Sequence, residues 1–434
     1  MKNGLISPLY HPKENMKQIV PDVEINESRY WNKDWNKELL FWLKPPFHSL
    51  EQTKILNLTN KQKLIAEPVK GHYRIRGIAG SGKTQVLAYR AAKLASMNYN
   101  VLVITFNITL WHYIQDMIKR APFTFDWSKI TLTYFHGFCK DIMNQYNVSW
   151  PEKNEFENEN VFRETVPNIV SELVKNNSQV KFDAILIDEG QDYYFEWYNM
   201  LCDFLSNRDE LVIVCDKKQN IYGRELSWID KRRKGLEKFG DWEELKTGMR
   251  LPEKIANITN EFSETYNLNQ ELKFDKKDTP EFIEVENFIW KNINDENWID
   301  ELKPAIQTIK KVSSSAHSSD TVILLPNKKL GFECVDYFKK MNVDVNHVFE
   351  TGSEERYHRH KKAFWMGDSR LKVSTIHSFK GWEVLNVIII IPKNIIGDLN
   401  KFDSCIYTAM TRTRQNLYII NSSKRYWDFG DKYK

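Results

Sequence analysis

A glycine-rich segment opens at Gly77 and reads Gly-Ile-Ala-Gly-Ser-Gly-Lys-Thr, which fits the pattern G-x-x-x-x-G-K-[ST]. Glycine carries no Cβ, so the backbone N–H groups of such a segment can curl round a phosphate group. Lys83 would neutralise the β- and γ-phosphates, and Thr84 would ligate Mg²⁺. The segment therefore predicts a site for ATP and Mg²⁺, with phosphate contacts from Gly77, Ala79, Gly80, Ser81, Gly82, Lys83 and Thr84.

A group of carboxylates follows an apolar run further along the chain, in the order Asp188, Glu189, Gly190, Gln191, Asp192. At the carboxyl end of a parallel strand, Asp188 would hold Mg²⁺ and Glu189 could activate the attacking water. A carboxylate cluster alone is typical of a solvated loop. Because this one ends an apolar strand downstream of the glycine-rich segment, we interpret it as the hydrolytic half of the same site.

Two series of elements would position these groups. Short apolar or β-branched runs alternate with stretches of helical periodicity, which predicts parallel sheets covered by helices. The first series predicts strands at 73–78, 101–106, 184–187 and 211–214, and helices at 84–97 and 109–119. The second predicts strands at 282–286, 321–325, 372–376, 384–391 and 417–420, and helices at about 297–312, 328–341 and 403–412.

Composition limits the class of protein. A chain of 434 residues suits about three domains, or two domains and an extra segment. A content of 41% hydrophobic and 28% charged residues is ordinary for a globular protein. A net charge of +4 means that any nucleic-acid affinity must come from a local groove. The five cysteines form no C-x-x-C pair for zinc or redox chemistry, and no long apolar run predicts a leader or a membrane span, so we expect a cytoplasmic protein.

The N-terminal residues read as an appendage. Trp31, Trp35, Phe41 and Trp42 could line one side of a helix that ends before Pro45, where packing is more expected than stacking on bases. We therefore expect an aromatic-rich extension at 1–55, a first α/β domain at 56–265 and a second at 266–434.

From about Leu58 to Ile420 the chain resembles the UvrD/Rep branch of the superfamily 1 helicases. The resemblance rests on the order of LTNKQ, the glycine-rich segment, VITFN, TYFHGF, IDEGQD, CDKKQNIYG, TGMR, STIHSFKGWE and YTAMTRTR. It implies two tandem RecA-like P-loop NTPase domains that clamp ATP between them. It also implies that hydrolysis is coupled to relative motion of the two domains.

The resemblance also implies roles for single residues. Gln62 matches the glutamine that reads adenine, and Gln219 matches one that links the γ-phosphate to the nucleic-acid groove. Arg250 and Arg412 match arginines that stabilise charge on the γ-phosphoryl group. The catalytic residues implied are Glu189, Gln219, Arg250 and Arg412, and further nucleotide contacts are Gln62, Asp188, Gln191 and Glu383.

A single strand of DNA, or of RNA, is the partner that the resemblance implies. The expected contacts are Thr105, Phe106, Phe135, His136, Arg224, Thr375 and His377. Arg224 stands where the family commonly has a base-stacking tryptophan, and it could stack through its guanidinium plane. Trp228 nearby could replace that tryptophan or could be a core residue. Met249 stands where an aromatic residue commonly stacks on adenine, and a thioether can still pack on a purine.

Larger members of the family insert whole domains at two places that are short here, 144–181 and 351–371. We therefore expect an ATP-driven single-strand translocase, with 3′ to 5′ movement implied by the family and weak unwinding of duplex. The alternative is an ATP-gated sensor of nucleic acid or nucleotides that regulates a partner nuclease, as in bacterial anti-phage defence. A small-molecule kinase is disfavoured, because the second α/β unit would have no role.

Overall fold

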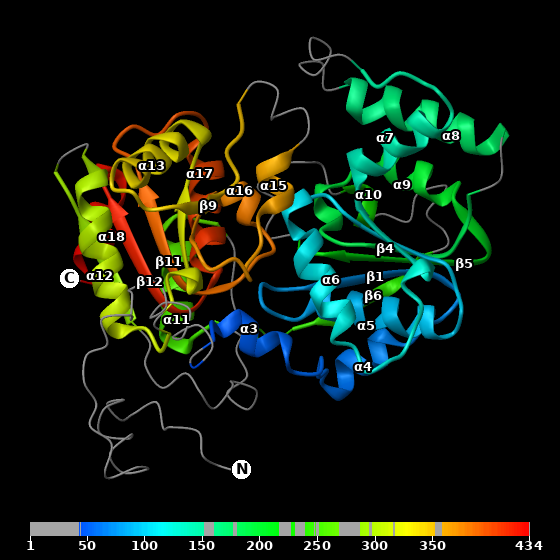
Figure 1. The fold of residues 1–434 in the computed structure, drawn as a ribbon, viewed down its shortest axis with the longest axis horizontal. Coiled ribbons are helices and arrows are strands. Elements are labelled where there is room, and N and C mark those ends of the chain that lie inside the picture. Colours follow the sequence, from blue (N-terminus) through cyan, green and yellow to red (C-terminus); the bar gives the residue numbers. More distant parts are fainter. Residues whose placement is uncertain are drawn as a thin grey trace, which may run out of the picture.

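The protein folds into two α/β units that lie side by side, each built on a six-stranded sheet (Figure 1). The computed structural model describes residues 43, 45–151, 160–176, 180–216, 227–230, 239–246, 248, 251–268, 287–294, 297–315, 317–351 and 358–433. Within these residues every strand pairing is parallel. The expected α/β class, with two tandem domains built on parallel sheets, is therefore confirmed.

The first sheet has the strand order β3-β2-β4-β5-β1-β6. Its strands are β1 (Gly71–Gly77), β2 (Val101–Thr105), β3 (Ile130–Tyr134), β4 (Phe182–Ile187), β5 (Leu205–Cys215) and β6 (Phe239–Leu245). Alternate residues of β4 enter separate cores, since Ala184 and Leu186 pack on one side of the sheet and Ile185 and Ile187 on the other. Both faces of the strand are thus buried, as its continuous apolar run predicts.

Helices cover both faces of this sheet (Figure 1). One layer holds α4 (Asn60–Ala66), α5 (Lys83–Ser96) and α6 (Trp111–Lys119), and the other holds α7 (Phe135–Gln145), α8 (Val166–Asn176), α9 (Phe195–Cys202) and α10 (Ser227–Asp230). Short turns η1 (Ile108–Leu110), η2 (Trp127–Lys129), η4 (Val161–Thr165) and η5 (Gly190–Asp192) complete the unit. The glycine-rich segment is the loop between β1 and α5, where a phosphate site needs it.

The second sheet has the order β7-β12-β11-β8-β10-β9. Its strands are β7 (Asn287–Asn292), β8 (Thr321–Leu325), β9 (Val345–His347), β10 (Leu371–Thr375), β11 (Val384–Ile391) and β12 (Thr413–Asn421). The helices and turns are α11 (Glu253–Thr265), η8 (Trp298–Glu301), α12 (Leu302–Val312), η9 (Ser318–Asp320), α13 (Lys328–Lys340), α15 (Arg359–Ala363), α16 (Ile376–Phe379), α17 (Leu399–Met410), η10 (Lys424–Tyr426) and α18 (Trp427–Asp431). The strand expected at 282–286 falls outside the described residues.

Two segments pack across the expected domain boundaries. Phe262 of α11, which the expected boundaries leave in the first domain, packs on Trp290 and Tyr426 of the second unit. The helix α3 (Phe47–Gln52) precedes the first unit in sequence, yet the Phe47 N–H donates to Asp320 of the second unit at 2.9 Å. The helix α11 therefore packs on the second unit, and the expected boundary at 265/266 stays a prediction. The predicted aromatic helix ahead of Pro45 lies outside the described residues apart from Leu43.

All five cysteines are free thiols, and four of them are buried. In the described part of the chain, no helix has both the length and the apolar character needed to cross a bilayer. Nor does that part bring together three or more His, Cys, Asp or Glu side chains in an arrangement that could hold a metal ion.

Candidate nucleotide site

The glycine-rich loop adopts the tight curl that its glycines predict. Gly80 and Gly82 have φ angles of 71° and 83°, a left-handed conformation that side chains rarely adopt. Gly82 is the residue from which α5 begins, and a Cβ there would lie 2.3 Å from Nε2 of Gln62. The Lys83 ammonium group donates to the carbonyls of Gly77 at 2.8 Å and Ile78 at 2.9 Å. The loop is therefore folded around its own cation.

Gln62 supports this loop from behind. Its side chain and that of Thr59 form a reciprocal capping box at the start of α4, and its Nε2 also donates to the Ser81 carbonyl at 2.9 Å. The side chain is buried, and both ends of its amide have partners inside the first domain. Reading of adenine by Gln62 stays a prediction; in this structure the residue holds the loop.

The expected Mg²⁺ ligands meet at the loop. Thr84 Oγ1 lies 3.2 Å from Asp188 Oδ2, where α5 begins beside the carboxyl end of β4. Burial, with the neighbouring Glu189 carboxylate as the next cause, raises the pKa of Asp188 above its ordinary range. Such a carboxylate gains from a bound cation, and a hydroxyl with one carboxylate is the small oxygen set that Mg²⁺ takes when phosphates complete its shell. The residues therefore fit the ion.

Glu189 is held in a special conformation by side chains around it. Its φ of 53° is left-handed, which is uncommon for a residue other than glycine and is found at functional sites. Gln191 donates to its carboxylate, and the Asp216 N–H donates to Gln191 at 2.9 Å. Burial acts to raise the pKa of Glu189, but the cations Lys380, Lys83 and Arg412 outweigh it and hold this pKa below its ordinary value.

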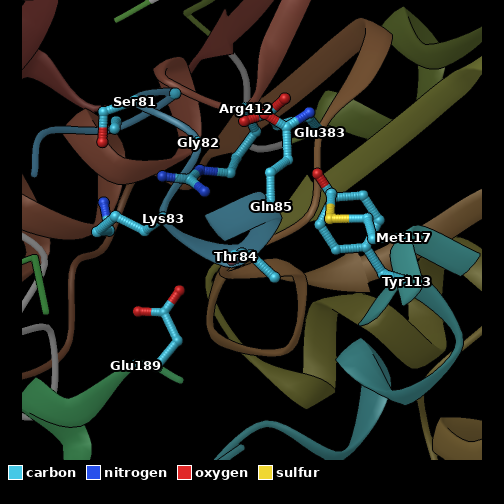
Figure 2. Close-up of a pocket in the computed structure, with 13 residues that line it drawn as sticks. Ser81, Gly82, Lys83, Thr84, Gln85, Tyr113, Met117, Glu189, Glu383 and Arg412 are labelled. Carbon is cyan, nitrogen blue, oxygen red and sulfur yellow. The ribbon is translucent and has the colours of Figure 1, made fainter. Parts of the chain in front are cut away.

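Both units contribute to one pocket (Figure 2). The first unit supplies residues 79–85, Tyr113, Met117 and Glu189, and the second supplies Gly381, Glu383 and Arg412. Lys83 and Glu189 lie at one end of this pocket, and Tyr113 and Met117 lie at the other. The pocket thus joins residues that are more than three hundred positions apart in sequence, as Ala79 and Arg412 are.

Arg412 is fixed at the turn between α17 and β12. Its Nε donates to the Thr408 carbonyl at 3.0 Å, and its Nη2 donates to the Thr411 hydroxyl at 2.8 Å. The guanidinium is buried at the pocket and acts on the Glu189 carboxylate. A cation here could stabilise charge that develops on a bound phosphate group, which is the role that the resemblance implies for Arg412.

Lys380 connects the two units, and the sequence reasoning missed it. This lysine follows α16 in the second unit, and its Nζ donates to both Asp192 oxygens at 2.8 and 2.7 Å and lies 3.6 Å from Glu189. All three side chains are buried. The signal was present, since Lys380 stands inside the STIHSFKGWE segment, but nothing local in sequence reveals that its partners follow β4.

Glu383 is held in the pocket by a chain of ion pairs. Arg414 donates from Nη2 to Glu383 at 3.1 Å and from Nη1 to Glu51 of α3 at 2.5 Å, and its guanidinium lies 5.4 Å from the centre of the Phe47 ring. The segment before the first unit thereby reaches a pocket residue of the second. The separation of Glu51 and Arg414 in sequence hides this link.

Two of the residues expected to contact the nucleic-acid strand are buried in this structure. Phe135 is 0% exposed, and its ring stacks on Trp197 with 4.0 Å between centroids, so it is a core side chain here. Thr105 is also 0% exposed, and its hydroxyl has no hydrogen-bond partner among the described residues. Sequence alone does not separate an aromatic residue in a core from one that stacks on a base.

Other residues expected to contact the nucleic-acid strand are partly exposed. Phe106 and His136 are half-buried, and their rings lie 6.0 Å apart over Trp197. His377 is half-buried on α16, and burial followed by Lys380 lowers its pKa. Thr375 caps the same helix by accepting from the Ser378 N–H at 3.1 Å. Their role in nucleic-acid binding stays a prediction.

Several expected site residues fall outside the described part of the chain: Gln219, Arg224, Met249 and Arg250. Trp228 is within it, is buried, and donates from Nε1 to the Tyr193 carbonyl at 3.2 Å. Of the two interpretations left open for Trp228, the core residue is the one that its burial supports.

Two family models match this chain. One, described as an AAA domain, matches residues 62–225, which run from Gln62 past the carboxylate cluster. The other, described as a UvrD-like helicase C-terminal domain, matches residues 371–420, which run from β10 to β12 and include Lys380, Glu383 and Arg412. No curated protein matches the chain. The two matches follow the order of the two halves of the pocket.

Proposed function

The chain belongs to the UvrD/Rep-like superfamily 1 helicases, and from that premise we propose that it hydrolyses ATP in response to single-stranded nucleic acid and moves along the strand in the 3′ to 5′ direction. The observation that carries the proposal is the composite pocket. Glu189 of the first unit and Arg412 of the second line the same cavity. Hydrolysis by such a site depends on how the two units approach each other.

The residues of the pocket divide the chemistry of hydrolysis. Glu189 keeps a low pKa, so it is ionised at neutral pH and can accept a proton from the attacking water. Lys83 and the loop N–H groups would hold the phosphates, and Arg412 would stabilise charge that develops on the transferred group. Mg²⁺, held by Thr84 and Asp188, supplies neutralisation of phosphate charge when bound.

The opposite end of the pocket suits a nucleobase. Tyr113 and Met117 offer an aromatic ring and a polarizable thioether there, and both pack well on a purine face. Glu383, between the two ends, would accept from ribose hydroxyls, in line with its implied role as a nucleotide contact. A nucleoside triphosphate bound here would thus have its phosphates at the glycine-rich loop and its base beside Tyr113 and Met117.

Hydrogen bonds between the units connect the expected nucleic-acid contacts to the nucleotide pocket. The Asn107 side chain, which follows β2, donates to the carbonyls of Ser378 and Lys380 at 3.0 Å each. Asn107 is next to the expected strand contact Phe106, and Lys380 is bound to Asp192 beside the pocket. A strand that moves one of these segments would therefore shift the cation that faces Glu189.

One observation favours the alternative, an ATP-gated sensor that regulates a partner such as a nuclease. Between β9 and β10, where larger family members carry an inserted domain, the described residues hold the five-residue helix α15 and no other helix. Without a domain that engages duplex, strand binding would control ATP turnover more than it would separate strands. Antiviral defence is the setting that this alternative suggests.

Hydrolysis of ATP by the full chain tests the proposal, measured with and without single-stranded DNA, single-stranded RNA and duplex at low salt. We expect a single strand to raise the turnover number several-fold and duplex to have less effect. A parallel assay on a 3′-tailed duplex separates the two functions. An ATP turnover number that no nucleic acid changes would exclude the translocase and leave the gated regulator. Processive unwinding of duplex by the chain alone would contradict the inference drawn from the short segments where larger members insert domains.

A further inference from the structure

A basic and aromatic surface lies where the two units face each other. It consists of Arg359 and Lys362, which are exposed on α15, and Trp365, which follows the helix and is 38% exposed. We call these three residues the α15 patch. None of them belongs to the nucleotide pocket, and none was among the strand contacts that the sequence predicted.

The topology of the two sheets places the α15 patch at the expected path of the nucleic-acid strand. In the first sheet β2 and β3 lie at one edge, and in the second sheet β10 and β9 lie at one edge. The expected strand contacts follow these strands, since Phe106 comes after β2, His136 after β3 and His377 after β10. The helix α15 follows β9, the remaining strand of this set, and lies between the two units (Figure 1).

The α15 patch is joined to both units. His112 of α6 donates from Nε2 to the Lys362 carbonyl at 2.8 Å, which fixes α15 to the first unit. Within the second unit, the Lys361 N–H donates to the buried Glu350 carboxylate at 3.2 Å, and the His360 ring stacks on His347 with 4.4 Å between centroids. A ligand bound to this helix would therefore contact a bridge between the units.

Trp365 is held in a built position. A Cβ at residue 367 would lie 2.3 Å from a carbon of the Trp365 ring, so the glycine at this position gives the indole its space. The rings of His48 and His112 lie 6.4 and 6.2 Å from the indole. The indole is thus fixed on one side and keeps an exposed part, which is the state that a stacking platform needs.

We propose that the α15 patch binds single-stranded nucleic acid, with Arg359 and Lys362 on backbone phosphates and Trp365 stacked on a base. This inference rests on the proposed function and adds a binding element to it. Cations with an interleaved aromatic ring form the usual surface for a single strand, because phosphates need charge and bases offer a π-face. Because the overall charge is only +4, such a local cluster is where affinity must reside.

The test compares the double variant Arg359→Gln/Lys362→Gln with a matched control, Lys310→Gln/Lys311→Gln. Both lysines of the control are exposed on α12, away from the α15 patch. Binding of a fluorescent oligo-dT strand is measured over a range of salt concentrations. Losing two phosphate contacts should lower the slope of log K against log salt by about 1.4 and weaken binding about tenfold at low salt, whereas the control should match the wild type.

A second variant, Trp365→Leu, tests the stacking role. We expect binding about fivefold weaker or more with an unchanged salt slope, since a base contact releases no counterions. ATP turnover without a strand should stay within twofold of the wild type in all these variants. If the wild type binds strands and the double variant behaves like the control, the α15 patch is excluded and the proposed function stands.

Two further outcomes are decisive. If the wild type binds no strand at low salt, the proposed function itself fails, and the inference fails with it. If the double variant loses duplex binding as strongly as single-strand binding, the assignment of the α15 patch to a single strand is overturned.

Discussion

The two halves of the nucleotide pocket are built in different ways. In the first unit, main-chain geometry does most of the work: glycines with left-handed φ angles shape the loop, and Lys83 is bound by the loop carbonyls. In the second unit, Arg412 is held by its neighbours Thr408 and Thr411, but two other residues are held by ion pairs with distant side chains. Glu383 depends on Arg414, which depends on Glu51, and Lys380 depends on carboxylates of the first unit.

This difference has a functional consequence. A site formed by main chain close to its own residues is present whenever the first unit is folded. A site formed by ion pairs between distant segments exists only in the arrangement that brings those segments together. We infer that the first half binds the nucleotide and that the second half reports the relative position of the units, so changes on the two sides should have effects of different kind and size.

Large effects are expected in the first half, where Lys83→Ala and Glu189→Gln should differ in kind. Loss of Lys83 removes a charge that contacts phosphate in both ground and transition states, so ATP binding and turnover should both fall. Glu189→Gln leaves the loop intact but removes the base, so turnover should fall by about 10² to 10⁴ while ATP binds and persists. Equilibrium binding of a fluorescent ATP analogue, with turnover in parallel, distinguishes them. Equal loss of nucleotide binding in both variants would contradict the two roles.

A smaller effect is expected from Lys380→Met, which breaks the contact between the halves. Lys380 helps to hold the pKa of Glu189 low, so its removal should raise that pKa. A base must be ionised, so the pH at which turnover falls on the acid side should rise. The variant also takes this cation away from the buried Asp192 carboxylate, so turnover at pH 7 should fall about tenfold or more.

The pH profile of kcat is the readout for Lys380, and Lys380→Arg, which keeps the charge, should restore most of the profile. An acid limb at the same pH in Lys380→Met as in the wild type would remove Lys380 from the electrostatics of the site.

A more modest effect is expected from Glu51→Gln, which loosens the support of Glu383. Arg414 would lose the Glu51 carboxylate and keep Glu383, so we expect the KM for ATP to rise about two- to fivefold with little change in kcat. Glu67→Gln is the control, since Glu67 pairs with Lys93 on the first unit outside the pocket. If both variants raise KM equally, the link from α3 to the pocket has no part in nucleotide binding.

The smallest effect concerns stability of the second unit. Burial lowers the pKa of Lys372, a fully buried residue of β10, from 10.5 to about 7. Between pH 7 and about 10.5 the unfolded chain keeps this proton and the folded chain does not, so stability rises with pH across that window. Below pH 7 both states are charged, and the full cost of burying the charge is present.

Thermal unfolding of Lys372→Met and wild type at pH 7 and pH 9 isolates this contribution. As pH rises, the free energy of unfolding of the wild type should increase relative to that of the variant by at most ~1.4 kcal/mol per pH unit. Each kcal/mol corresponds to roughly 2 to 4 °C in Tm. Lys340→Met, at an exposed position, should show no such trend. A constant difference in Tm between wild type and Lys372→Met would show that Lys372 does not titrate in this window.

Sequence reasoning succeeded where structure is local. The loop at Gly77 and the apolar strands β8 and β11 were predicted with the bounds that they have, because glycines, helix capping and continuous apolar runs act over a few residues. Strands β3, β6, β7 and β9 were not predicted, since their sequences, such as ITLTY and FGDWEEL, are short or polar. Their place in a sheet is set by tertiary pairing.

The candidate site was likewise predictable only where it depends on local sequence motifs. Lys83, Thr84, Asp188, Glu189 and Arg412 lie together at the pocket as the motifs implied. The partners of Lys380, Arg414 and Glu383 could not be foreseen, because ion pairs between distant segments leave no periodic pattern. Phe135 lies in the core, stacked on Trp197. The burial of this aromatic residue could not be predicted, because an aromatic residue in a motif can pack in a core as readily as it can stack on a base.

The composite nature of the site is tested most directly by turnover and ATP affinity of Arg412→Ala, measured beside the wild type in the presence of a single strand. Arg412 is the second-unit cation that lines the pocket opposite the glycine-rich loop. If the second unit acts on the transition state, turnover should fall by about 10³-fold or more while the affinity for ATP changes only a few-fold. A turnover number close to that of the wild type would contradict a site completed by both units.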